Sequence, residues 1–137
     1  MRLEVGQKLD PFVVEQVRGD TMRLVAALMD DPNPIHFNPK ASQSLGLGER
    51  LVTQGPVAVG FLLTMIARNL GRADRVVYSK ARFLGSIFEN DRVECSGEII
   101  DIDDEAKIAT IACKAHVSGE NVLTLTAQVD LNDSDLI

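Results

Sequence analysis

The stretch QGPVAVGFLLTMIARNLG, residues 54–71, is the segment on which the fold depends. Pro56 stands where a helix begins, because its missing N–H costs little in a first turn, and Gly71 is a typical helix stop. We therefore expect a helix over residues 56–70. The apolar run from Val57 to Ala67 is too short for the roughly 20 residues of a membrane span. It covers nearly every side of the helix, so other parts of the chain must enclose it.

Four runs rich in β-formers follow this helix, at residues 75–84, 91–102, 107–118 and 122–131. In the last three, apolar residues recur at every second position and share one face of the strand. Those positions are Val93, Cys95, Gly97 and Ile99, then Ala109, Ile111, Cys113, Ala115 and Val117, then Leu123, Leu125, Ala127, Val129 and Leu131. Polar turns at 103–105 and 119–121 predict an antiparallel meander. A further strand over residues 12–17 completes an α+β fold, the hotdog architecture, in which one curved antiparallel sheet surrounds one apolar helix.

The segment between the first strand and the central helix combines a helix with a rigid loop. Asp20 is a suitable cap for a helix over residues 21–29, in which Met22, Val25, Ala26 and Met29 form one apolar stripe. Pro32 and Pro34 push the residues before them toward extended geometry, so residues 31–36 form a stiff loop. A short helical turn is expected at residues 39–45.

Composition limits the classes of function. With 137 residues, residues 1–137 are expected to form a single domain. A formal charge of −6 and a pI near 4.8 argue against nucleic-acid binding. Residues 1–10 lack the features of a signal peptide, so we expect a cytoplasmic protein. Cys95 and Cys113 show no metal-binding spacing, and we expect both to be reduced, packed thiols.

His36 follows the proline-rich loop, with Asp31 five residues and Asn33 three residues before it. Histidine titrates near neutral pH, and a nearby carboxylate can orient it, which favours an acid–base pair around a water molecule. Asp30, Asp31 and Asn33 could instead simply satisfy helix ends and turns. The spacing alone leaves both interpretations open.

The motif around these residues resembles that of the MaoC-like proteins and (R)-specific enoyl-CoA hydratases. The family carries Asp-x-Asn-Pro-(Ile or Leu)-His followed by Asp or Asn, and the matching positions here are Asp31, Asn33, Pro34, Ile35, His36 and Asn38. Gln54 and Gly55 before the long helix, and residues 82–91, resemble further parts of the family pattern. The resemblance extends from Val5 to Leu131.

This resemblance implies that Asp31 and His36 are the catalytic pair, whereas Asp30 stands where the family commonly has glycine and is a helix-end residue. The implied reaction is hydration of trans-2-enoyl thioesters of CoA or an acyl-carrier protein to (3R)-3-hydroxyacyl thioesters, or the reverse dehydration. The N–H of Gly55 would stabilise the thioester oxygen, with Asn33 and Gln54 as further substrate-binding residues. We expect neither a metal nor another cofactor, and we expect a homodimer.

Three departures from the family pattern, Gln54, Pro56 and Gly60, leave two alternatives open. One is a non-catalytic hotdog subunit that shapes an acyl tunnel for a partner chain. The other is a thioesterase, although residues 56–70 contain no carboxylate of the kind that such enzymes often place near this helix.

Two further features bear on the site. His116 alternates with the apolar set of its strand and is expected to face solvent. The basic residues that could meet a phosphate of CoA or a carrier protein are Arg68, Arg72, Arg75, Lys80 and Arg82.

Overall fold

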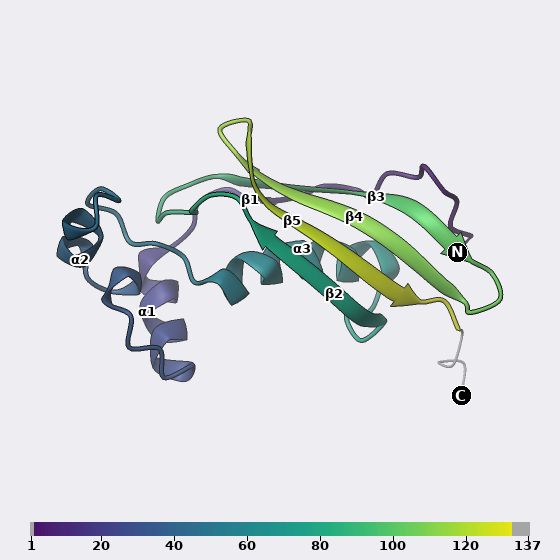
Figure 1. The fold of residues 1–137 in the computed structure, drawn as a ribbon, viewed down its shortest axis with the longest axis horizontal. Coiled ribbons are helices and arrows are strands. Elements are labelled where there is room, and N and C mark those ends of the chain that lie inside the picture. The colour runs from purple at the N-terminus through teal and green to yellow at the C-terminus, as the bar shows by residue number, and fades with distance from the viewer. Residues whose placement is uncertain (1, 133–137) are drawn as a thin grey trace.

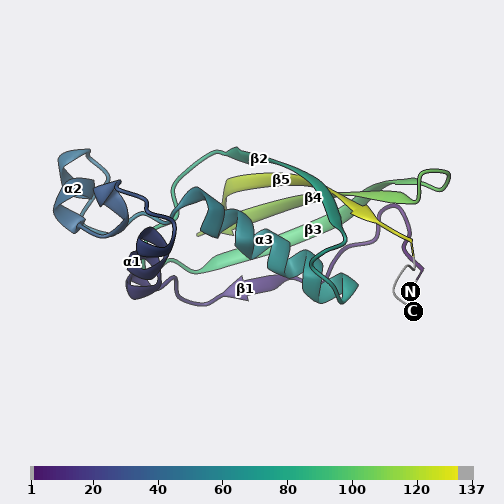
Figure 2. The same ribbon diagram turned by 90° about the horizontal axis from the view of Figure 1, so that it is seen from below.

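The computed structural model describes residues 2–132, and a single helix crosses beneath a curved antiparallel sheet (Figures 1 and 2). The elements in chain order are β1 (Phe12–Val14), α1 (Gly19–Leu28), the 3-10 turn η1 (Pro34–His36), α2 (Pro39–Ser44), α3 (Gly55–Leu70), β2 (Val76–Phe83), β3 (Val93–Asp103), β4 (Ile108–Val117) and β5 (Glu120–Asp130). The predicted α+β hotdog fold is confirmed. None of the helices within residues 2–132 combines the length and apolar character needed to cross a membrane.

The strand order of the sheet is β1-β3-β4-β5-β2, and every neighbouring pair is antiparallel. The predicted meander is correct for β3, β4 and β5. It does not extend to β2, which lies beside β5 at the far edge rather than beside β3. The β4–β5 hairpin turns at Ser118 and Gly119, both with positive φ, 51° and 79°, between the paired residues Val117 and Glu120. Positive φ at both central residues matches the twist of the flanking strands.

The core forms between α3 and the concave face of the sheet. Most of the alternating positions predicted for β3, β4 and β5 are buried, with Cys95, Ile111 and Leu125 at most 1% exposed, whereas Gly97, Val117 and Leu131 are half-buried. The curved sheet packs on one side of α3, so within residues 2–132 the predicted enclosure of this helix is partial. Ala58, Leu62, Met65 and Ile66 are buried, while the helix residues on the other side are half-buried.

The N-terminal elements differ from the prediction in detail. β1 ends at Val14 instead of continuing to Val17, and α1 begins at Gly19, so that Asp20 lies in its first turn instead of capping it. The apolar stripe of α1 is buried only at Met22 and Ala26, because α1 projects past the end of the sheet (Figure 2).

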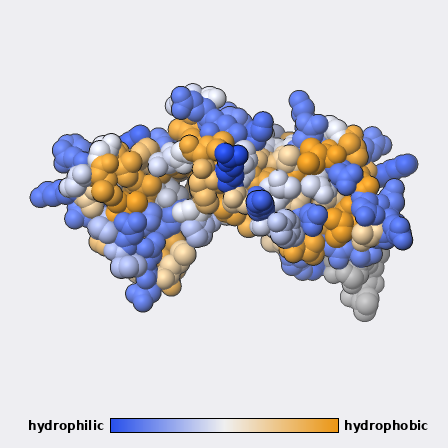
Figure 3. All heavy atoms as spheres, viewed as in Figure 1, coloured by the Kyte–Doolittle hydropathy of each residue, from blue (hydrophilic) through white to orange (hydrophobic). Residues whose placement is uncertain are grey.

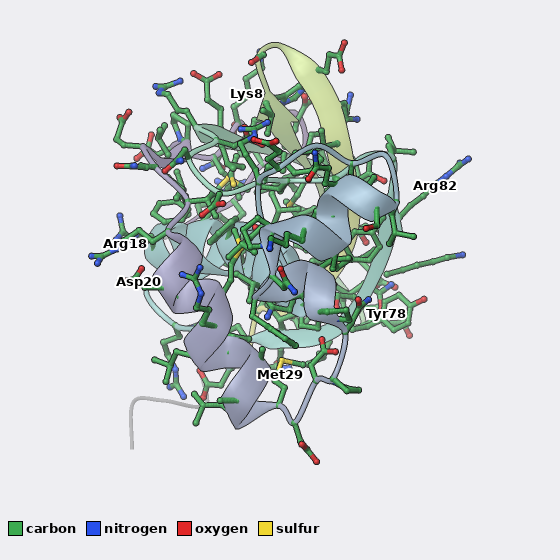
Figure 4. The ribbon with its side chains drawn as sticks, turned by 90° about the vertical axis from the view of Figure 1, so that its left-hand side faces the viewer. Lys8, Arg18, Asp20, Met29, Tyr78 and Arg82 are labelled. Carbon is green, nitrogen blue, oxygen red and sulfur yellow. The ribbon has the colours of Figure 1, made fainter. Side chains whose placement is uncertain are left out.

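The end of the molecule formed by α1 and α2 carries apolar side chains on its surface (Figure 3). The exposed large apolar residues of this region are Leu24, Leu28, Met29, Phe37 and Leu45. Met29 lies at the end of α1, away from the core (Figure 4), which explains why the stripe predicted from the sequence stops before it.

Candidate active site

The loop after α1 is shaped by local hydrogen bonds that present the Asp31 carboxylate. Asp30 takes a left-handed conformation with φ of 50°, which ends the helix. Glycine adopts this backbone conformation with the least steric strain. The N–H of Asp31 donates to the Ala26 carbonyl at 2.9 Å, and one Asp31 oxygen accepts from the Asn33 N–H at 3.0 Å. Asp30 is therefore a helix-end residue, as expected, and Asp31 keeps its second oxygen for the site.

Asn33 caps the 3-10 turn that brings His36 inward. Its side-chain oxygen accepts from the Ile35 N–H at 3.3 Å, and the residue is exposed. The segment predicted as a stiff loop thus contains one tight turn, with Pro34 at its start. Asn38 plays the same role for α2 by accepting from the Lys40 N–H at 3.0 Å.

His36 is buried and anchored by the main chain of a distant residue. Its Nδ1 lies 2.6 Å from the carbonyl oxygen of Val52, and the N–H of Val52 donates to the Ile35 carbonyl at 3.0 Å. A carbonyl can only accept, so Nδ1 carries a proton and donates. In the neutral ring the lone pair therefore belongs to Nε2.

The free nitrogen of His36 faces the free oxygen of Asp31. His36 Nε2 lies 3.5 Å from Asp31 Oδ2, and the side chains are 10% and 26% exposed. With the ring neutral, both atoms are hydrogen-bond acceptors, so one water molecule can donate to both. With the ring protonated, the same two groups form an ion pair. This arrangement suits a group that alternately takes up and returns a proton.

The N-terminus of α3 supplies a hydrogen-bond donor. The carbonyl of Gln54 accepts from Val57 and Ala58, at 3.1 and 3.2 Å, and Pro56 has no N–H. Within residues 2–132, no acceptor faces the N–H of Gly55 at hydrogen-bond distance. A free N–H at the positive end of a 16-residue helix can stabilise negative charge on an oxygen atom.

The side chain of Gln54 points away from this donor, toward α1. It is 1% exposed, and its Nε2 donates to the carbonyl of Met22 at 2.9 Å. Gln54 thus joins α1, which leads into Asp31, to the start of α3. The sequence grouped Gln54 with the substrate-binding residues; its Nε2 is engaged between the two helices, while its Oε1 is buried without a hydrogen-bond partner among the described residues.

A cleft of about 260 Å³ opens beside Gly55, and Val52 and Phe83 are among its lining residues that were not predicted from the sequence. Val52 lines the cleft and also anchors His36, while the ring of Phe83 lies against Gly55. A Cβ built on Gly55 would lie 3.0 Å from Phe83 Cζ. No sequence signal marks Val52, because it acts through its main-chain carbonyl.

The other candidate residues lie outside this group. His116 is half-buried on β4, opposite Glu94 of β3, and lines a polar groove with Arg92 and Ser118. Cys95 and Cys113 are free and buried, as predicted. The described residues hold no group of three His, Cys, Asp or Glu side chains that could coordinate a metal ion.

The basic residues are spread over several elements. Arg68 lies over the ring of Phe12, 4.6 Å from its centroid, Arg72 pairs with Asp74, and Arg75 donates to the Asp130 carbonyl at 3.3 Å. Lys80 and Arg82 are exposed on β2, where Arg82 projects into solvent on the same side as Tyr78 (Figure 4).

The fold and this site define a hotdog protein with an Asp–His pair beside the start of its central helix. The family model described as "MaoC like domain" matches residues 2–121, and the chain belongs to that family. The comparison with curated protein sequences finds no match.

Among solved structures, the (R)-hydratase from A. caviae involved in PHA biosynthesis superposes with a TM-score of 0.85 and 23% identity, over 95% of this chain and 98% of that one. R-hydratase PhaJ1 from Pseudomonas aeruginosa superposes with a TM-score of 0.82 and 19% identity, over 96% of this chain and 84% of that one. A chain of the ChsH1-ChsH2 complex from Mycobacterium tuberculosis superposes with a TM-score of 0.83 and 14% identity, over 96% of this chain and 100% of that one. At these identities the likeness establishes the fold.

Proposed function

We propose that this protein hydrates trans-2-enoyl thioesters of CoA or an acyl-carrier protein to (3R)-3-hydroxyacyl thioesters, and catalyses the reverse dehydration. The observation that carries the proposal is the pairing of His36 Nε2 with Asp31 Oδ2 at 3.5 Å, with Nδ1 fixed on Val52. Family membership supports the same class of reaction, since the matching model is that of the MaoC-like dehydratases.

In the hydration direction, one water molecule is divided across the double bond. Its O–H bond breaks, the hydroxyl adds to C3, and the released proton goes to the Asp31–His36 pair. A proton is then delivered to C2, so the pair returns to its starting state and no other reactant is needed. Two acceptors that hold the water by its hydrogens leave an oxygen lone pair directed at C3.

Negative charge develops on the thioester oxygen when C3 is attacked. We assign the Gly55 N–H, at the positive end of α3, as the hydrogen-bond donor to this oxygen. Removing one such donor commonly lowers the rate of an enzyme by about 100- to 1,000-fold. Asn33 and Gln54 contribute indirectly, Asn33 by capping the turn that carries His36 and Gln54 by joining α1 to α3.

Two observations favour this proposal over the alternatives. A non-catalytic subunit has no need of a buried histidine anchored beside a carboxylate, although similar structures include complexes of two chains. Thioesterases of this fold often carry a carboxylate on the central helix itself, and α3 has no acidic residue.

The proposed assembly is a homodimer in the cytoplasm, formed through β2. This strand pairs with β5 on one side only, and it is a longer edge than β1, which has three residues. Val77 and Tyr78 are 57% and 52% exposed on it. Pairing with β2 of a second copy of the chain would bury these side chains and give hydrogen-bond partners to the unpaired backbone groups of this edge.

The decisive experiment follows the loss of the conjugated thioester absorbance when the protein is incubated with crotonyl-CoA. The expected product is 3-hydroxybutyryl-CoA of R configuration, identified by chiral chromatography, and the reverse reaction is followed from that product. Asp31→Asn is the matched inactive control. Absence of turnover with both CoA and acyl-carrier-protein thioesters would reject the proposed reaction.

A further inference from the structure

A carboxylate on the turn before β3 contacts two segments that lead to the proposed catalytic pair. It belongs to Glu89, which is half-buried. Its Oε1 accepts from the N–H of Leu51 at 3.0 Å, and the N–H of Glu89 donates to the Leu51 carbonyl at 2.9 Å. Its Oε2 lies so close to Gly19 that a Cβ built there would overlap it. Glu89 therefore joins the start of α1 to the segment that precedes α3.

The contact with Leu51 acts on the anchor of His36. Leu51 is fully buried, and the next residue, Val52, accepts from His36 Nδ1 at 2.6 Å. Because Glu89 bonds both the N–H and the carbonyl of Leu51, it fixes the main chain at this point. A shift of Leu51 would move the Val52 carbonyl and, with it, the imidazole ring.

The contact with Gly19 acts on the helix that leads into the active-site loop. Arg18, the N-cap of α1, makes no side-chain capping hydrogen bond. Glu89 adds its charge to that of Asp20 at the positive end of this helix, where a carboxylate is stabilising. Glycine leaves room for the carboxylate, whereas a side chain at this position would push it away from its other hydrogen bond.

Small movements at the start of α1 are enlarged at its other end. The helix projects past the end of the sheet (Figure 2), and its 10 residues span about 15 Å. A tilt of about 4° over that length displaces the far end by about 1 Å, and Asp31 follows shortly after this end. A misplacement of about 1 Å can lower a rate about 100-fold. The separation of 3.5 Å between His36 Nε2 and Asp31 Oδ2 therefore depends on how the start of α1 is held.

We propose that Glu89 is a positioning residue for the catalytic pair. Its carboxylate fixes α1 relative to the segment that anchors His36, and so sets the distance between His36 and Asp31. The inference rests on the proposed hydratase function. Main-chain bonds also hold this turn, since the N–H of Asn90 donates to the Val17 carbonyl at 2.7 Å. Loss of the carboxylate should therefore change the geometry of the site without unfolding the chain.

The first test is steady-state kinetics with crotonyl-CoA. Glu89→Ala should lower kcat about 10- to 100-fold and change KM by less than about 3-fold, because the groups that bind the thioester near Gly55 are untouched. Glu89→Gln, which keeps an oxygen for the N–H of Leu51, should recover most of kcat. Glu49→Ala removes an exposed carboxylate from the neighbouring loop and should keep the wild-type rate.

The second test examines the contact with Gly19 independently of activity. Gly19→Ala should lower the Tm of the wild type, because its methyl group displaces the carboxylate. It should not lower the Tm of Glu89→Ala, since alanine is the better helix former once the carboxylate is gone. Equal losses of Tm in the two backgrounds would show that Gly19 and Glu89 do not interact.

The third test uses the ring protons of His36 as a probe of the pair. The chain has two histidines, so His116→Ala assigns their NMR signals. Glu89→Ala should shift the His36 signals, and Glu49→Ala should not.

The outcomes separate this inference from the proposed function. Wild-type kcat in Glu89→Ala, or unmoved His36 signals, would overturn the positioning role and leave the hydratase function intact. A Glu89→Gln variant as slow as Glu89→Ala would contradict the role of the bond to Leu51. If the wild type turns over no enoyl thioester, the proposed function fails, and the NMR shift of His36 decides the positioning role separately.

Discussion

The side-chain amide of Gln54 donates to the main-chain carbonyl of Met22, so the start of α3 is bonded to the helix that leads into the Asp31 loop. Beside this junction lies a surface groove of about 230 Å³ lined by Met22, Val57 and Phe61, among others. Gln54 and Met22 are each 1% exposed, so this hydrogen bond lies in the packed interior where the two helices meet.

We expect Gln54→Leu to lower the free energy of unfolding by about 1–3 kcal/mol, the usual cost of losing a buried hydrogen bond. It should also lower kcat for crotonyl-CoA, because Asp31 and Gly55 are then less well placed. Urea unfolding and steady-state kinetics measure the two effects. Met22→Leu is the matched control, since it keeps the main-chain carbonyl and roughly the side-chain volume. Full activity in Gln54→Leu would show that the bond does not position the site.

His36→Ala and Asp31→Asn should each reduce kcat for enoyl-thioester hydration by at least about 100-fold. Because both groups act on one water molecule, the double variant should be little slower than either single variant. His116→Ala, which alters a histidine of a separate groove, should retain the wild-type rate. Losses that multiply in the double variant would mean that the two side chains act independently.

Gly55→Ala should lower kcat/KM about 10-fold or more, because its methyl group would lie 3.0 Å from Phe83 Cζ and crowd the approach to the N–H. The fold should survive, since Phe83 is half-exposed and its ring can turn aside. Gly60→Ala in the same helix is the control. Its Cβ meets nothing within 4 Å, so it should raise stability by up to about 1 kcal/mol. Undiminished activity in Gly55→Ala would contradict the role given to this end of α3.

The thiols of Cys95 and Cys113 should resist modification in the folded protein. Burial raises the pKa of each thiol to about 12, compared with about 8.5 in an unfolded chain. In a titration with a disulfide reagent at pH 8, both should react only after denaturant is added. Fast reaction of the native protein would contradict the packing of these strands.

The same shift in pKa predicts a loss of stability in alkali. Between about pH 8.5 and pH 12, the unfolded chain releases thiol protons that the folded chain keeps. The stabilising contribution is therefore complete below this window and falls as pH rises through it. Melting temperatures across the window should decline less steeply for Cys113→Ala than for the wild type.

The protein should sediment as a dimer at micromolar concentration, and Val77→Glu on the β2 edge should shift it toward monomer, because it places a charge in the proposed interface. Val5→Glu is the control, as Val5 is also an exposed apolar residue, 62% accessible, but lies outside the strands. A wild-type protein that sediments only as a monomer would reject assembly through β2.

The sequence by itself predicted most of the secondary elements and singled out Asp31 and His36, whose side chains the fold places 3.5 Å apart. Alternation with a period of two is a local property, so the buried faces of β3, β4 and β5 could be read from residues such as Cys95, Ile111 and Leu125. The family motif likewise singled out Asp31 rather than Asp30, and the left-handed backbone of Asp30 explains why.

Only the tertiary structure decided how these pieces meet. The anchoring of His36 by Val52 and the bond from Gln54 to Met22 join residues 16 and 32 positions apart, and one of the two partners in each contact is a main-chain carbonyl. Every residue type carries such a carbonyl, so no pattern of side chains in the sequence indicates which residue will accept the hydrogen bond. The path of the chain around α3 places β2 beside β5 and the ring of Phe83 against Gly55. Hydrophobic periodicity does not specify this path.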